Sequence, residues 1–144
     1  MYSSARTIRR IGRLPVARRD DPNGDRFFAL RTFRRDGSAV STPIWLAPAD
    51  GRWYGYTPGR SAKVRRLRRD PRVEVAGSDF DGNPAQPWRT GTARLLTGRE
   101  LRTAKRALTA KYGNAFRFFV LVTLAGSVRR NGGRAVGLEI TLDG

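Results

Sequence analysis

Short β-rich runs separated by Asp-Gly pairs constrain the fold of this chain more than any other feature of its sequence. Asp36-Gly37 separates the run 27–33 from the run Val40 to Ala47. Asp50-Gly51 precedes a third run, Arg52 to Thr57. An Asp-Gly pair readily adopts the positive φ angles of tight hairpin turns, so each pair predicts antiparallel neighbours on its two sides. The first half of the chain is therefore expected to form a series of hairpins.

A short basic helix is expected directly after these hairpins. Ser61 is a natural N-cap, and the helix is expected to end before Pro71, because a proline disfavours the helical conformation of the residue before it. Val64 and Leu67 have the spacing of one helical face and are predicted to point inward. A strand from Arg72 to Ala76 follows.

The remainder of the chain combines strands with two helices. A strand from Trp88 to Leu96 comes first. It is followed by a helix that begins with a Thr97–Glu100 capping box, carries Leu101, Ala104 and Leu108 on one face and ends at Gly113. A second helix from Ala115 to Ala125 and a strand from Ala135 to Leu142 complete the chain. Pro43 argues that its run is an edge strand or locally irregular. The order is typical of a mainly β, antiparallel barrel with helices at its ends, not of a doubly wound sheet.

The length of 144 residues suits one domain, which is expected to span residues 26–144. Residues 1–25 are expected to be an irregular or partly helical lead-in, with Ile8, Ile11 and Leu14 at three-residue spacing. No apolar run approaches the roughly 20 residues of a membrane span, and the Arg-rich start lacks the apolar centre of a secretory signal. The expected location is the cytoplasm, with no membrane partner.

The chain contains no histidine and no cysteine, which excludes several kinds of catalytic site. There can be no His/Cys metal site, no thiol nucleophile and no imidazole base. Many of the few carboxylates lie in turns such as Asp36-Gly37, where turn formation is the expected role. If the protein is an enzyme, its chemistry must reside in a bound cofactor that the chain positions. The sequence therefore identifies no metal ligands and no catalytic residue.

The formal net charge of +17 predicts an anionic partner. Arginine supplies most of the positive charge, because Lys63, Lys105 and Lys111 are the only lysines. A charge of this size attracts polyanions, whether a nucleic acid, an acidic cofactor or a membrane surface.

The start of the basic helix combines the groups that hold a phosphate. The N–H groups of a helix N-terminus, the hydroxyl of Ser61 and the ammonium of Lys63 would lie together there. A cation is otherwise disfavoured at this end, because the helix dipole already makes it positive. The pattern predicts a phosphate site, while a solvated basic helix that caps a sheet explains the local sequence equally well.

Six segments carry a family resemblance when they are taken in order. They are Thr32 to Gly37, Ser41 to Trp45, Ser61 to Val73, Gly91 to Arg94, Ala110 to Gly113 and Leu138 to Thr141. The ordered set resembles the split β-barrel oxidoreductases related to pyridoxamine-phosphate oxidase, and in particular their coenzyme F420-dependent branch. No single segment is diagnostic, but together they cover most of the chain from Phe27 onward.

The resemblance implies a homodimeric split barrel of six or seven strands, with two cofactor sites at the dimer interface. It implies that the strand Ser41 to Trp45 runs beside a flavin or deazaflavin ring. It also implies that the segment Thr57 to Val64 holds the phosphate, with Lys63 as the main cation. The implied cofactor-binding residues are Ser41, Thr42, Pro43, Ile44, Trp45, Thr57, Arg60, Ser61, Ala62, Lys63, Val64, Arg65 and Trp88.

Two positions remain open within this resemblance. Some relatives carry Arg where this chain has Ser61, so Arg60 or Arg65 is expected to supply the second charge. Trp88 is expected either to wall the site across the dimer or to be an ordinary core or rim aromatic. The candidates for binding an acidic cofactor tail are Arg65, Arg66, Arg68 and Arg69.

The predicted function is that of an oxidoreductase that uses F420, or alternatively FMN, for hydride transfer to or from a small organic substrate. One alternative is a nucleic-acid-binding module, in which arginines contact phosphates and exposed Trp53, Tyr54 and Tyr56 stack on bases. The sequence shows neither a recognition-helix pattern nor an aromatic RNP-type strand, which argues against that alternative. The other is a protein that binds a flavin, deazaflavin or haem-like ligand without turnover, with haem disfavoured because no His or Cys can ligate it.

Overall fold

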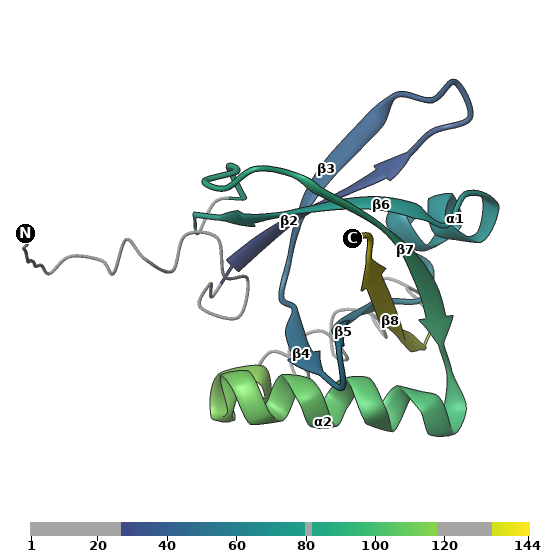
Figure 1. Ribbon diagram of the computed structural model, residues 1–144. Coiled ribbons are helices and arrows are strands. Elements are labelled where there is room, and N and C mark those ends of the chain that lie inside the picture. The colour runs from purple at the N-terminus through teal and green to yellow at the C-terminus, as the bar shows by residue number, and fades with distance from the viewer. Residues whose placement is uncertain (1–26, 80–81, 118–133) are drawn as a thin grey trace, which may run out of the picture.

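The computed structural model describes residues 27–79, 82–117 and 134–144, and its strands form one antiparallel sheet. The elements are β2 (Phe27–Phe33), β3 (Ala39–Ile44), β4 (Ala47–Ala49), β5 (Arg52–Pro58), α1 (Ala62–Arg69), β6 (Arg72–Ser78), β7 (Arg89–Leu96), the 3₁₀ turn η3 (Gly98–Glu100), α2 (Leu101–Tyr112) and β8 (Ala135–Leu142). Within these ranges seven strands follow the order β3-β2-β6-β7-β8-β5-β4. The sheet curls into a half-barrel (Figure 1), so the predicted antiparallel split barrel is confirmed.

The first hairpin forms as its Asp-Gly pair predicts. β2 and β3 pair antiparallel, with Ala29 opposite Pro43. In the turn Gly37 has a φ of 87°, and the carboxylate of Asp36 accepts hydrogen bonds from the N–H and the hydroxyl of Ser38. β3 is an edge of the sheet, which is where a proline that cannot donate to the ladder is tolerated.

The predicted strand Val40 to Ala47 is wrong in its second half. β3 ends at Ile44, and after two residues the chain enters the separate strand β4, which pairs with β5 across the Asp50-Gly51 turn. The side chain of Leu46 is fully buried, and its carbonyl oxygen accepts hydrogen bonds from Lys111 Nζ at 2.9 Å and from the Tyr112 hydroxyl at 3.0 Å. These contacts with α2 divert the backbone from one edge of the sheet to the other.

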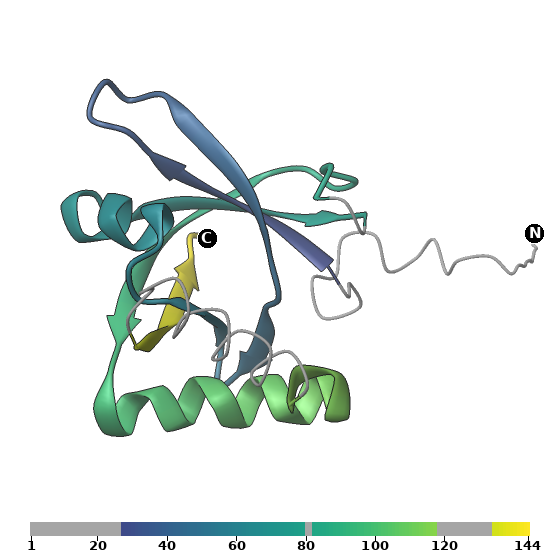
Figure 2. The same cartoon turned by 180° about the vertical axis from the view of Figure 1, so that it is seen from behind.

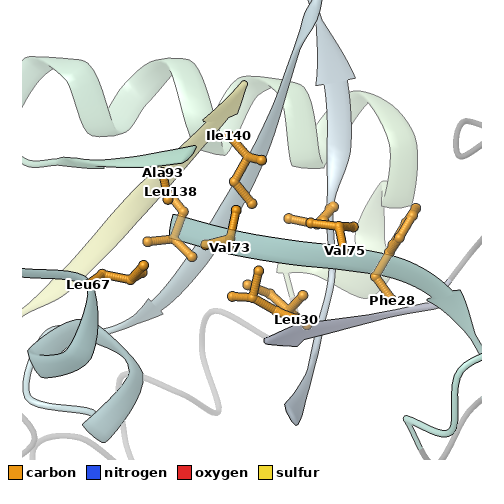
Figure 3. Packing of buried hydrophobic residues seen from close by; sticks show 10 residues of the cluster. Phe28, Leu30, Leu67, Val73, Val75, Ala93, Leu138 and Ile140 are labelled. Carbon is orange, nitrogen blue, oxygen red and sulfur yellow. The ribbon is translucent and has the colours of Figure 1, made fainter. Parts of the chain in front are cut away.

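The interior of the half-barrel is filled by one group of apolar side chains (Figure 3). Its buried members are Phe28, Leu30, Ile44, Leu46, Leu67, Val73, Val75, Ala93, Leu138 and Ile140. Leu67 comes from α1, and Val64 of the same helix is also buried, so both inward positions predicted for this helix are confirmed. Each such side chain contributes roughly 1.5–3 kcal/mol on burial, which fixes α1 against the sheet.

α2 covers a different part of the sheet from α1 (Figures 1 and 2). It packs against β4, β5 and β8. Tyr54 and Tyr56 of β5 are buried there against Ala104 and Leu108, which lie on the predicted apolar face of the helix. The second core beneath α2 therefore uses the alternate residues of β5 that do not face the barrel interior.

The two ends of α2 compare differently with the sequence. Gly113 ends the helix with a φ of 60°, as predicted. The predicted capping box is wrong, because the side chain of Thr97 makes no capping bond and the residues after it form η3. The carboxylate of Glu100 instead accepts a 2.8 Å hydrogen bond from Arg94 Nη1.

Some predictions fall on residues that the structure does not describe. Residues 114–117 are helical, while the rest of the predicted second helix and the lead-in 1–25 lie outside the described residues. Within the described ranges, no helix is long and apolar enough to cross a membrane.

Candidate cofactor site

The first turn of α1 is a capped helix N-terminus, as predicted. The hydroxyl of Ser61 accepts a hydrogen bond from the N–H of Val64 at 3.4 Å, and its carbonyl oxygen accepts one from the N–H of Arg65 at 3.2 Å. The N–H groups of Ala62 and Lys63 lie in the part of a helix that has no internal acceptors. The first turn contains no acidic residue. This end of α1 therefore presents donors and positive charge together.

Lys63 is a half-buried cation beside β3. Its Nζ lies 3.5 Å from the carbonyl oxygen of Pro43, a long contact that joins the start of α1 to the edge strand. Burial, and to a smaller extent the charge of Arg66, lowers the pKa of Lys63 to about 8. No carboxylate of the described residues forms an ion pair with this ammonium. A cation in such surroundings is stabilised by an incoming anion.

Arg66 is a further cation of the site. It follows Lys63 by three residues and so lies on the same side of α1. Its Nε donates a 2.6 Å hydrogen bond to Oγ1 of the fully buried Thr32 on β2, which holds the guanidinium in place. The sequence analysis proposed Arg60 or Arg65 as the second phosphate cation and named Arg66 only as a candidate for binding the cofactor tail. The spacing of three from Lys63 was the signal that could have found it.

Arg60 and Arg65, which the sequence analysis proposed as the second phosphate cation, contact each other beside the N-cap. Arg65 Nη1 donates a hydrogen bond to the carbonyl oxygen of Arg60 at 3.1 Å, so the exposed Arg65 side chain folds back over the start of α1. A role for either residue in binding a phosphate stays a prediction.

The arginines proposed to bind the acidic cofactor tail make different contacts in the structure. Arg69 Nη2 donates a 3.0 Å hydrogen bond to the carbonyl oxygen of Phe33, and Arg66 is bound to Thr32. Both arginines therefore anchor α1 to β2, and Arg68 lies on another side of the helix.

Thr42 brings an unsatisfied polar atom to the site. Its Oγ1 is buried and has no hydrogen-bond partner among the described residues. Thr42 lies opposite Leu30 in the β2–β3 ladder, so the two side chains share the interior face of the half-barrel. Thr32 lies two residues beyond Leu30 and shares that face as well. A buried hydroxyl without a partner carries a free-energy cost, which a polar ligand atom on this face would remove.

The predicted ring-binding segment does not present one continuous face. Ser41 and Pro43 lie on the opposite face of β3 from Thr42, because side chains alternate along a strand. Trp45 lies beyond the end of β3 and stacks on the ring of Tyr112 in α2, with the ring centroids 4.7 Å apart.

Three other predicted binding residues have buried side chains. Ile44, Thr57 and Val64 are 6%, 3% and 0% exposed, respectively. Ile44 belongs to the apolar interior described above. The part of the predicted set that lies at the start of α1 or contacts it is therefore Ser61, Ala62, Lys63 and, through its carbonyl oxygen, Pro43.

Trp88 packs over the other face of the sheet. Its ring centroid lies 3.8 Å from the guanidinium carbon of Arg31, which forms a 3.0 Å ion pair with Glu74. Arg31 is opposite Ser41 in the ladder, so this stack lies on the face away from Thr42. Within one chain Trp88 does not join the interior face of the site, and a role across a dimer stays a prediction.

The nucleic-acid alternative predicted that the aromatic side chains of β5 are exposed, and this prediction is wrong. Tyr54 and Tyr56 are each 4% exposed and pack beneath α2. Trp53 is half-buried and packs on Phe28, with the ring centroids 5.8 Å apart. The alternation along β5 places all three rings in the two cores, so they do not form an exposed surface on which bases could stack.

The arrangement can bind an anion but offers little for acid–base chemistry. In the described part of the chain, no group of three or more acidic, His or Cys residues could hold a metal ion. The carboxylate of Glu139 accepts hydrogen bonds from Arg94 and Tyr54, and that of Asp70 accepts them from Arg72. These carboxylates serve structural contacts.

A half-barrel with a cationic helix start beside an edge strand defines a split-barrel protein with a candidate anion-binding site. The chain belongs to the pyridoxamine 5'-phosphate oxidase family, which matches residues 17–142. No curated protein sequence matches the chain.

Solved structures share this fold. The protein Atu2129 of unknown function from Agrobacterium tumefaciens has a TM-score of 0.61 and 20% identity over 83% of this chain and 49% of its own, so this chain spans about half the length of that protein. A FAD-binding protein from Mesorhizobium loti has a TM-score of 0.54 and 16% identity over 85% and 82% of the two chains. The heme storage protein HutZ from Vibrio cholerae has a TM-score of 0.57 and 8% identity over 84% of each chain.

Proposed function

We propose that this protein is an oxidoreductase that binds the deazaflavin F420 at the start of α1 and transfers hydride to or from a small organic substrate. The observation that carries the proposal is Lys63, a half-buried ammonium whose pKa is lowered by burial and which has no carboxylate partner in the described ranges. Membership of the pyridoxamine 5'-phosphate oxidase family and the fold shared with a FAD-binding protein support a flavin-type cofactor.

The residues beside α1 fit the phosphate end of such a cofactor. The backbone N–H groups of Ala62 and Lys63 and the Lys63 ammonium would hold the phosphate through charge-assisted hydrogen bonds. Arg66 would add a second charge, and its bond to Thr32 already fixes its position. The Thr42 hydroxyl would donate to a polar atom of the cofactor and lose its unsatisfied state.

A bound deazaflavin or flavin supplies the hydride donor or acceptor, so the protein needs no acid–base residue for that step. This agrees with a chain that contains no histidine and no cysteine. The contribution of the chain is then to bind the cofactor, to orient it beside β3, and to exclude water with the apolar side chains of the half-barrel.

F420 is proposed ahead of FMN because of charge. Its acidic glutamate tail would meet a chain with a net charge of +17 and the exposed Arg65 at the start of α1. FMN would use the same phosphate site without the additional contacts. We further propose a homodimer in which the second protomer completes the site, as the family resemblance implies.

The test is a titration of the full chain with FMN and, separately, with F420, in which binding is measured by absorbance and fluorescence. We expect both to bind, with F420 tighter at low salt and the difference smaller at physiological salt. Turnover with a panel of reductants and electron acceptors then separates an enzyme from a binder without activity. Binding of neither cofactor, combined with salt-sensitive binding of nucleic acid, would overturn the proposal.

The dimer is tested separately by sedimentation of the protein with cofactor bound. A monomer at micromolar concentration in that state contradicts the proposed homodimer.

A further inference from the structure

A basic pocket lies on another side of α1, away from the site beside β3. Its volume is about 620 Å³, and it is lined by the segment before α1, the end of β5, the start of β8 and the start of α2. Four of the lining residues are cations, namely Arg60, Arg68, Lys105 and Arg134, and none of the described lining residues is acidic.

Three of these four cations have no acidic partner among the described residues. No carboxylate of the described residues forms an ion pair with Arg68, Lys105 or Arg134. The Lys105 ammonium lies 5.8 Å from the centroid of the Tyr56 ring, which forms part of the pocket wall. Cations that converge on a concave surface without a counter-charge raise the local concentration of anions there.

The pocket and the site at Lys63 occupy different sides of the same helix. At 3.6 residues per turn, five residues separate Arg68 from Lys63 by about 140° around α1. Lys63 contacts Pro43 of β3, whereas Arg68 lines the pocket together with Arg134 at the start of β8. Val64 and Leu67 are buried in the sheet between these two sides. The helix therefore serves two basic surfaces that do not share a side chain of α1.

The far wall of the pocket is formed by the segment that leads into α2. Thr97 and Gly98 line it, and Gly98 is the first residue of η3. Leu101 and Lys105 of α2 continue this wall.

We propose that this pocket is a second anion site that binds a small ligand with clustered negative charges, either phosphates or carboxylates. Four cations around about 620 Å³ match a multivalent anion better than a single carboxylate. A concave pocket of this size holds a small ligand, and its lining includes no exposed aromatic platform that would favour a single-stranded nucleic acid.

The experiment is calorimetric titration of the full chain with inorganic pyrophosphate and, separately, with triglutamate. These two probes distinguish a phosphate ligand from an oligocarboxylate ligand. The variants are Arg68→Ala and Arg134→Ala, with Arg102→Ala as the control, because Arg102 is an exposed arginine of α2 outside the pocket. Lys63→Ala reports any share of the binding that belongs to the other site.

We expect one probe to bind at physiological salt, with a loss of about three- to tenfold in affinity for Arg68→Ala and for Arg134→Ala. Arg102→Ala should change the affinity less than about twofold, and Lys63→Ala should leave the binding that Arg68 and Arg134 support in place. Equal small losses for all four variants would overturn the proposal in favour of a diffuse basic surface. Binding of neither probe, or a loss confined to Lys63→Ala, would also overturn it.

Discussion

Arg66 donates a 2.6 Å hydrogen bond to the hydroxyl of Thr32, whereas the hydroxyl of Thr42 on the same face of the neighbouring strand has no partner among the described residues. The two threonines therefore predict opposite effects of the same substitution. Thr32→Val removes a bond to a charged group and should lower the free energy of unfolding by about 1–2 kcal/mol. Thr42→Val removes an unsatisfied buried hydroxyl and should leave stability unchanged or raise it by up to about 1 kcal/mol.

Cofactor titration completes this comparison. Thr42→Val should weaken cofactor binding by about three- to tenfold if the hydroxyl contacts the cofactor. Chemical denaturation and cofactor titration of both variants provide the measurements. A Thr42→Val protein that loses stability like Thr32→Val would show that the hydroxyl already has a structural partner.

A second prediction concerns the charge at the start of α1. Lys63→Ala should weaken binding of the phosphate-bearing cofactor by about tenfold to hundredfold, because a charge-assisted bond contributes roughly 1.5–3 kcal/mol. Arg69→Ala removes a cation from the same helix, but Arg69 is exposed and bonded to Phe33, so its effect should stay below about 1 kcal/mol and fade with salt. If both variants lose the same amount of cofactor affinity and salt removes the loss, Lys63 does not bind the phosphate.

The lowered pKa of Lys63 predicts a pH dependence of stability. Its pKa is about 8 in the folded protein and 10.5 ordinarily, so between these values the unfolded chain binds more protons than the folded one. The contribution of this group to stability therefore rises with pH across that window, and the penalty is fully present below about pH 8. Lys63→Met should stabilise the cofactor-free protein more at about pH 7 than at about pH 9.5.

Cofactor binding should have the opposite pH dependence. The affinity for the phosphate should fall as the ammonium loses its proton above about pH 8, and this fall should be absent in Lys63→Met. Burial raises the pKa of Tyr54 and of Tyr56, so these side chains do not ionise in the same window. An affinity that is flat across this range in the unmodified protein would contradict the assignment.

Gly59 predicts a steric effect between the segment before α1 and β8. Its N–H donates a 2.8 Å hydrogen bond to the carbonyl oxygen of Arg134, and a Cβ at this position would clash with the same oxygen. Gly59→Ala should therefore lower the free energy of unfolding by about 1–3 kcal/mol. Arg134→Ala keeps the carbonyl and should change stability by less than about 0.5 kcal/mol, as measured by denaturation. Similar losses for both would mean that the Arg134 side chain carries the effect.

The last prediction concerns the carbonyl oxygen of Leu46. Tyr112→Phe removes one of its two hydrogen bonds from α2 and should cost about 0.5–1.5 kcal/mol in the free energy of unfolding. Lys111→Met removes the other, and the double variant should lose more than the sum of the two single losses, because the buried carbonyl then has neither donor. Strictly additive losses would show that each residue acts through separate contacts.

The hairpins, the Ser61 cap and the inward face of α1 could be predicted from the sequence because each depends on local chemistry. An Asp-Gly turn, a serine before a helix and a spacing of three residues act over one turn of chain. Trp45 and Leu46 could not be predicted in this way, since their course is set by Lys111 and Tyr112 more than sixty residues later.

The same difference between local and long-range contacts explains which parts of the candidate site could be predicted. The sequence indicated Lys63 because the helix start and the cation are adjacent in the chain. It named Arg66 only as a candidate for the cofactor tail, because the partner of that side chain, Thr32, lies on a different element. It also expected the whole segment Ser41 to Trp45 to run beside the cofactor ring, whereas side chains alternate along the strand and Trp45 packs on Tyr112.

The crossing at Trp45 and Leu46 joins the two edge strands of the sheet directly. An insertion into this two-residue connection would let those edges move apart. The hairpin turn at Asp36-Gly37, in contrast, projects from the sheet (Figure 1). Insertions should therefore be tolerated at the turn and excluded at the crossing. Among the descendants of such a chain, length variation would gather at the hairpin tip, and the two-residue crossing would keep its length even where its side chains change.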